Sequence, residues 1–253
     1  MNKILFTKSR TVKSVSLAIM LGLILTAGIE NAVALSNCQN KHPPANPALS
    51  KAYGKSLTEW MMLHSAWYNQ GQDPLLGTIG HVKLLPLPQQ LPTPIIPPDL
   101  PQVGSFSTGS LNISLNPRTP FVLPVISLSG ESYVNDVLPP DDLLPYKSSL
   151  LTADIKVTLD GKTILQSPAD NQQFFYGPAY FPEPIAYNPP QFRFTDKVLG
   201  DVYAAAISSS MGIGFVHPPL SVGKHTLKLH AVNFDLGYGF TNTWNITVKP
   251  SRK

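Results

Sequence analysis

The sequence predicts a mainly β protein, an immunoglobulin-like antiparallel β-sandwich preceded by one amphipathic helix and a proline-rich arm. Apolar and polar residues alternate in several short runs after about residue 103, as in strands with one buried face. One apolar stripe at the helical period precedes them. Of the 253 residues, 26 are proline, about twice the usual share, and most of the excess lies in two segments.

The first 34 residues resemble a secretory signal peptide. Lys3, Lys8, Arg10 and Lys13 precede an almost unbroken apolar run over 15–29. Ala32 and Ala34 are the small residues that a cleavage site needs. The run is shorter than the roughly 20 residues that a membrane-spanning helix needs. We therefore expect a secreted or periplasmic protein, or one held at the cell surface, without a membrane span in the mature chain. An uncleaved N-terminal anchor is the alternative.

The charge balance excludes one class of partner. Basic residues outnumber acidic ones by four in the whole chain, but four basic residues and one acidic residue lie in the predicted signal peptide. A nearly neutral mature chain lacks the clustered Lys and Arg that bind phosphates, so we expect no nucleic-acid partner.

Cys38 is the only cysteine, so no intrachain disulfide can form. Residues 35–38 have the outline of a lipoprotein box, although Asn37 stands where a small residue is expected. The two readings are a lipidated Cys38 and a free thiol in a flexible tether over 35–48.

Residues 49–102 are expected to form the helix and the arm, both packed on the domain. Ser56 and Glu59 have the spacing of a capping box, and a helical stripe follows, which predicts a helix over about 57–69. His64 lies within this stripe and is interpreted as a core residue rather than a ligand. The proline-rich stretch 83–101 excludes helix and central strand, and predicts an extended polyproline arm or a spacer.

Residues 103–250 are expected to form the sandwich. Period-two runs occur at 111–115, 155–159, 227–231 and 244–248. Asp160-Gly161 is a hairpin signal, because a type I′ turn needs two positive φ angles. Pro124 within the apolar run 121–128 predicts an edge strand or a bulge.

No catalytic, dinucleotide, phosphate-loop or zinc motif is present, and we expect no metal and no cofactor. His225 and His230 would lie on opposite faces of one strand. The acidic concentration around Glu131, Asp136 and Asp141 is interpreted as a solvated loop. An alternative function, a secreted hydrolase, depends on such carboxylates converging in the fold.

The aromatic segment over 174–194 is the candidate contact surface. It is interpreted as a loop that prolines stiffen, and its candidate ligand-binding residues are Tyr176, Tyr180, Phe181 and Tyr187. The expected function is therefore a non-catalytic exported protein that binds a glycan, an envelope component or another surface protein. The alternative is that this loop covers an open end of the sandwich.

Two triplets, 112–114 and 245–247, fit the pattern for N-glycosylation and fall on predicted strands.

The chain resembles a group of secreted microbial proteins without an assigned activity. The resemblance depends on the leader, on Tyr53-Gly54 before the Trp60 helix, and on the segments 121–126, 157–161 and 219–226. It implies export and a sandwich-like C-terminal part, and it transfers no site residue.

Overall fold

The computed structural model describes residues 51–92 and 104–250. These residues belong to one compact unit, Asn40–Lys253. The predicted signal peptide, the tether, Cys38 and part of the proline-rich arm lie outside the described residues. Among the described helices, none is long and apolar enough to cross a membrane.

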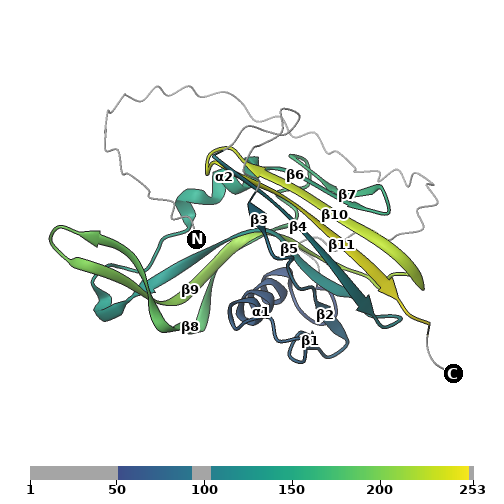
Figure 1. The fold of residues 1–253 in the computed structure, drawn as a ribbon, viewed down its shortest axis with the longest axis horizontal. Helices are drawn as coiled ribbons and strands as arrows, with labels where there is room; N and C mark the ends of the chain where they lie inside the picture. Colours follow the sequence, from purple (N-terminus) through teal and green to yellow (C-terminus); the bar gives the residue numbers. More distant parts are fainter. Residues whose placement is uncertain (1–50, 93–103, 251–253) are drawn as a thin grey trace, which may run out of the picture. The chain divides into compact units, whose positions relative to one another are not determined.

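Strands dominate the described chain, as the sequence predicts (Figure 1). The helices are α1 (Leu57–Asn69) and α2 (Lys147–Thr152), with short 3₁₀ turns at Val134–Asp136 and Leu144–Tyr146. The strands are β1 (Thr78–Ile79), β2 (Val82–Leu84), β3 (Leu91–Pro92), β4 (Ser105–Leu115), β5 (Phe121–Tyr133), β6 (Asp154–Leu159), β7 (Lys162–Gln166), β8 (Phe175–Asp196), β9 (Gly200–His217), β10 (Gly223–Asn233) and β11 (Tyr238–Val248).

The strands form two sheets, which confirms the predicted β-sandwich. One sheet has the order β1-β2-β5-β9-β8, and the other has the order β3-β4-β11-β10-β6-β7. Most pairs are antiparallel, but β4 runs parallel to β11 and β2 runs parallel to β5. Both sheets therefore contain parallel and antiparallel pairs, whereas the sequence predicted antiparallel pairs only. The alternation of apolar and polar residues predicts a strand but not the direction of its neighbour.

The main core lies between the two sheets. Inward-facing apolar residues of β5 and β9 meet those of β6, β10 and β11, and the largest of them are Trp244, Phe121 and Phe215. The predicted inward runs over 155–159, 227–231 and 244–248 all place their apolar residues in this core, as expected. Burial of this apolar surface is the main force that holds the two sheets together.

Helix α1 covers the outer face of the five-stranded sheet. It begins and ends where the sequence predicts, and both halves of its capping box are formed: Glu59 N–H donates to Ser56 Oγ, and Ser56 N–H donates to Glu59. A second core forms beneath it, in which Trp60 and Met61 pack against Val122 and neighbouring residues. The predicted stripe is therefore the surface that docks the helix.

The proline-rich arm crosses from one sheet to the other. Leu85 N–H still donates to Val122 of β5, whereas Leu91 pairs with Thr108 of β4 in the opposite sheet. Between these points Trp244 Nε1 donates to the carbonyl of Pro86 at 2.8 Å. Residues 85–90 form neither helix nor strand, as the prolines predict. The arm prediction is wrong at Lys83 and Leu84, which belong to β2, because the prolines that prevent pairing begin only at Pro86.

The aromatic segment is not a loop, as the sequence suggested, but most of strand β8 at the edge of the five-stranded sheet. Four irregularities in its pairing with β9 accommodate its prolines, and an edge strand needs ladder hydrogen bonds on one side only. The distal parts of β8 and β9 extend away from the six-stranded sheet as a long hairpin (Figure 1).

The turn and bulge predictions have mixed outcomes. Asp160 and Gly161 have φ angles of 51° and 77° and join β6 to β7, as a type I′ hairpin requires. Strand β5 has a register shift between Pro124 and Ile126, which confirms the bulge. It is not an edge strand, because β2 and β9 pair with its first residues on both sides.

Candidate functional site

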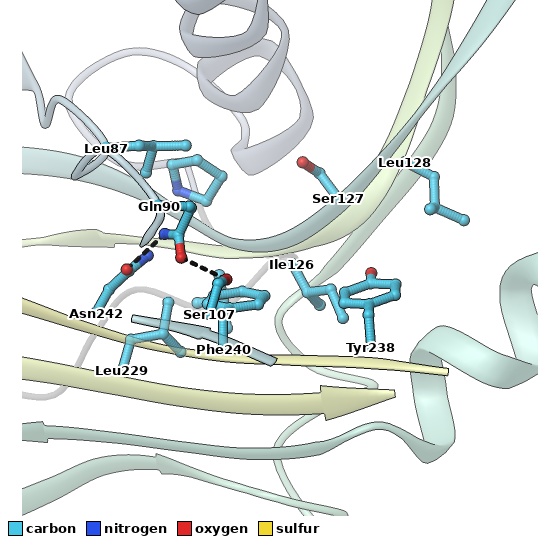
Figure 2. Close-up of a pocket in the computed structure, with 12 residues that line it drawn as sticks. Leu87, Gln90, Ser107, Ile126, Ser127, Leu128, Leu229, Tyr238, Phe240 and Asn242 are labelled. Carbon is cyan, nitrogen blue, oxygen red and sulfur yellow. Dashed lines mark hydrogen bonds between the residues drawn. The ribbon is translucent and has the colours of Figure 1, made fainter. Parts of the chain in front are cut away.

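A cavity of about 390 Å³ lies between the two sheets, beneath the proline-rich arm (Figure 2). We call it the inter-sheet cavity. Its walls come from β5, from the inward residues of β11 and β10, and from the arm, and most of them are apolar. The lining residues are Leu87, Gln90, Ser107, Pro124, Val125, Ile126, Ser127, Leu128, Leu229, Tyr238, Phe240 and Asn242.

The path of the arm explains why space remains at this place. Strand β2 pairs with β5 only through Lys83 and Leu84, opposite Phe121 and Val122. Beyond Val122, β5 has no strand neighbour on that side among the described strands. The arm then leaves for β4 in the other sheet, so it bridges the open edge of the sandwich instead of filling it.

A small polar cluster closes one end of the inter-sheet cavity. Gln90 Nε2 donates to Asn242 Oδ1 at 2.6 Å, and Ser107 Oγ donates to Gln90 Oε1 at 2.7 Å (Figure 2). The arm can approach this closely because residue 109 is glycine: a Cβ there would lie 2.7 Å from Pro88 Cβ and 2.8 Å from Asn242 Oδ1. Asn242 is almost fully buried, so the cluster also satisfies an amide that burial would otherwise penalise.

Tyr238 lines the inter-sheet cavity farther along β11, on the side of Leu128 (Figure 2). Burial raises the pKa of its hydroxyl to about 12, so the group stays protonated at neutral pH. None of the hydrogen bonds formed among residues 51–92 and 104–250 involves this hydroxyl. It is therefore available to a ligand as a donor or an acceptor.

A second cavity of about 270 Å³ adjoins the first, and we call it the helix-side cavity. The two share Leu87, Pro124 and Ser127. Its other lining residues lie on α1, on β5 and at the start of β8, and most are polar: Met61, His64, Ser65, Tyr68, Asn69, Ser129 and Tyr176.

His64 forms the inner wall of the helix-side cavity. Its Nε2 lies 2.7 Å from the Leu85 carbonyl oxygen, which can only accept, so Nε2 carries a proton. Complete burial lowers the pKa of the ring to about 4, so His64 is neutral at physiological pH. It is the satisfied core histidine that the sequence predicts, and it also anchors the arm.

The four aromatic residues predicted to bind a ligand are not brought together. Tyr176 is buried beneath α1 and shares a hydrogen bond with Ser210, whereas Tyr180 is 64% exposed on the edge strand. Phe181 is half-buried, and the Tyr187 hydroxyl donates to Glu131 at 2.7 Å. Their spacing along an irregular strand sends them to different surroundings, and only Tyr176 lines one of the cavities described above.

The acidic residues of the hydrolase alternative are only partly gathered. Asp141 accepts from the Glu131 backbone N–H at 3.0 Å and from the Tyr133 hydroxyl at 2.9 Å. The Glu131 carboxylate is bound by Arg193 and Tyr187, while Asp136 lies exposed in a 3₁₀ turn. Among the described residues, no group of three or more His, Cys, Asp or Glu side chains could hold a metal ion.

A Ser–His–Asp arrangement occurs where the sequence gave no motif. His225 Nδ1 lies 2.7 Å from Asp160 Oδ2, and Nε2 lies 3.4 Å from Ser221 Oγ. The same Nε2 is closer, at 2.8 Å, to the backbone carbonyl of Ser221. A carbonyl oxygen can only accept, so Nε2 donates to it and has no lone pair with which to take a proton from Ser221 Oγ. We interpret the arrangement as a clamp that holds the 219–222 turn against the β6–β7 hairpin.

The outer face of the six-stranded sheet holds the two glycosylation triplets. Asn112 and Asn245 are opposite each other on β4 and β11, and Asn245 Nδ2 donates to Asn112 Oδ1 at 2.9 Å. They line a third cavity of about 420 Å³ with neighbouring Ser, Thr and Lys residues. His230 also faces outward, opposite to His225, as the period of the strand predicts.

Comparison with protein-family models gave no match, and comparisons with curated proteins and with solved structures gave no significant match. The functional interpretation therefore depends on the geometry of the cavities.

Proposed function

We propose that the protein is an exported, non-catalytic binding protein, and that its ligand is a small apolar molecule held in the inter-sheet cavity. The observation that carries this proposal is the cavity itself. Its volume of about 390 Å³ and its mostly apolar lining with a few convergent polar groups are typical of small-molecule sites. Of the partners considered from the sequence, an envelope component fits such a site best.

The geometry gives less support to the hydrolase alternative. Neither Asp nor Glu occurs among the described residues that line the three cavities. A glycosidase would need two carboxylates that face each other across a substrate site. Glu131 and Asp141 instead have their oxygens occupied by protein donors.

Binding can be tested with an apolar fluorescent probe such as N-phenyl-1-naphthylamine, titrated into the full mature protein. We expect saturable binding that the substitution Leu128→Trp weakens at least tenfold. Leu128 is half-buried in the cavity wall, and the larger indole ring of Trp would fill part of the cavity. Val222→Trp is the matched control, since Val222 is 56% exposed and lines none of the described cavities. A folded Leu128→Trp variant that binds the probe like the wild type would overturn the proposal.

Export is tested separately by mass spectrometry of the native N-terminus. We expect Leu35 as the first residue of the mature chain. An intact Met1 contradicts export by cleavage, and a lipidated Cys38 as first residue means that the protein is anchored at the surface.

A further inference from the structure

We propose that the ligand is a single-chain amphiphile with an uncharged head that carries hydroxyl or amide groups. Its alkyl chain would lie in the inter-sheet cavity and its head in the helix-side cavity. This inference rests on the proposed function and specifies the class of ligand.

The two cavities adjoin each other and differ in polarity, so together they suit a molecule with one apolar and one polar end. They meet at Leu87, Pro124 and Ser127, where β5 has lost its neighbour β2. On one side of this junction the walls are the apolar inner faces of two sheets. On the other side they are polar residues near the end of α1, where Tyr68 and Asn69 are exposed. A chain entering from the helix side thus leaves its head among these polar residues.

The inter-sheet cavity suits one linear chain. Its wall on β11 runs through the successive inward residues Tyr238, Phe240 and Asn242, which covers about 14 Å of strand. Leu229 of β10 and Ile126 of β5 line the cavity from the two sheets (Figure 2). A volume of about 390 Å³ stretched over that length leaves a narrow slot rather than a round chamber.

The head must be uncharged because nothing in the described lining would balance a charge. No Asp, Glu, Lys or Arg is among the described residues of either cavity, and the buried His64 is held neutral by its surroundings. A carboxylate or phosphate placed there would lose its hydration without gaining a counter-charge, which is costly. The hydroxyl groups of Ser65, Ser127 and Ser129 can instead exchange hydrogen bonds with a neutral head.

Calorimetric titration with 1-O-alkylglycerols from hexyl to dodecyl, below their micelle concentrations, tests the chain. We expect the affinity to rise about fourfold for each added methylene until the chain fills the cavity. In the Leu128→Trp variant the affinity should stop rising at a shorter alkyl chain than in the wild type. In Val222→Trp the dependence of affinity on chain length should be unchanged. Affinity that does not depend on chain length would overturn the placement of the chain.

Fatty acid anions of the same chain lengths test the head. At a pH where the acid is ionised, we expect binding at least tenfold weaker than that of the matched alkylglycerol. Equal binding of the two would refute the uncharged head even where the apolar probe binds and the proposed function stands. If neither the probe nor any amphiphile binds, the proposed function fails together with this inference.

A variant that prefers fatty acids over alkylglycerols would show where the head of the ligand lies. Ser127 is exposed and lines both cavities, so Ser127→Lys should fold and should place an ammonium group at their junction. We expect this variant to improve fatty acid binding at least tenfold relative to the alkylglycerol, and Val222→Lys, the control, to change neither. No gain in Ser127→Lys would mean that the head lies elsewhere.

Discussion

Arg193 on β8 binds the carboxylate of Glu131 on β5 through two nitrogens, although β9 lies between these two strands. Arg193 Nε donates to Glu131 Oε2 at 2.6 Å, and Tyr187 donates to the other oxygen at 2.7 Å. Interaction with this carboxylate raises the pKa of the Arg193 guanidinium further, so the guanidinium keeps its charge. The network joins the three strands where β5 ends, close to the turn between β8 and β9.

Removing Arg193 should therefore loosen the hairpin. The Glu131 side chain is only 16% exposed, and Arg193→Met would leave it with one hydroxyl donor. Because both side chains keep some contact with water, we expect a loss of about 1–3 kcal/mol in the free energy of unfolding by urea. Lys197→Met at the exposed hairpin tip is the matched control. Equal stability of the two variants would contradict a structural role for the pair.

His64 should make the protein sensitive to mild acid. Its pKa is lowered to about 4 in the folded state, whereas an unfolded histidine titrates near 6.5. Between these values the unfolded chain binds the proton and the folded chain does not, so stability falls as the pH drops through this window. From pH 7 to pH 5 we expect a loss of about 2 kcal/mol from this residue.

The control for this prediction is His64→Gln, which keeps a donor for the Leu85 carbonyl but does not titrate. Urea unfolding at pH 7 and pH 5 should show a smaller decrease in this variant than in the wild type. Hydrogen bonds to Ser56 lower the pKa of Glu59, so Glu59 loses its contribution to stability as the pH falls from the ordinary glutamate value through its folded pKa, below the two pH values compared. An unchanged pH dependence in His64→Gln would show that the buried ring does not control acid stability.

Local patterns were sufficient to predict much of the fold. The Ser56–Glu59 cap, the Asp160-Gly161 turn and the inward runs of β6, β10 and β11 each depend on residues close in sequence. The aromatic segment was misread because proline is expected to prevent pairing, whereas an edge strand with bulges tolerates it.

The candidate site could not be predicted in the same way. It exists because the arm leaves β5 and joins β4, which brings Gln90 to Asn242 across more than half of the chain. Neither the arm nor β11 contains a local signal for this contact. Gly109 was the one sequence feature that could have suggested it, because a glycine within a strand often marks a close approach of another segment.

Gly109 should be essential for seating the arm. An added Cβ would lie 2.7 Å from Pro88 Cβ and 3.0 Å from the Gln89 carbonyl, so Gly109→Ala must displace the arm. We expect a loss of about 1–3 kcal/mol in stability and weaker binding of the apolar probe, because the Gln90 bonds close one end of the cavity. Ser110→Ala, on the exposed outer face of the same strand, should change neither quantity. Probe affinity that survives in Gly109→Ala would argue that the arm is not part of the site.

Two tyrosines of the aromatic segment should differ sharply in their effect on stability. Tyr180→Ala should alter the free energy of unfolding by no more than about 0.5 kcal/mol, because its ring is 64% exposed. Tyr176→Ala should cost about 3–5 kcal/mol, because it leaves a cavity beneath α1 and an unpaired Ser210 hydroxyl. If Tyr180 instead contacts a surface ligand, its variant loses capture in a glycan or envelope pull-down at unchanged melting temperature.

Variants of Ser221 and His225 distinguish two roles for the Ser221–His225–Asp160 arrangement, a structural clamp and a catalytic nucleophile. As a clamp, it depends on the ring and the carboxylate: His225→Gln should lower the free energy of unfolding by about 1–3 kcal/mol, because the Asp160 bond at 2.7 Å and the bond to the Ser221 carbonyl are lost. Ser221→Ala keeps both bonds and should leave the stability unchanged.

A fluorophosphonate probe completes the comparison, since it labels only an activated serine. We expect no labelling of the wild type, because the His225 Nε2 that would have to accept the Ser221 proton already faces the Ser221 carbonyl. Labelling of the wild type that disappears in both Ser221→Ala and His225→Gln would reverse this reading. It would make the turn before β10 the site of an acyl-transfer reaction, independently of whether the inter-sheet cavity binds an amphiphile.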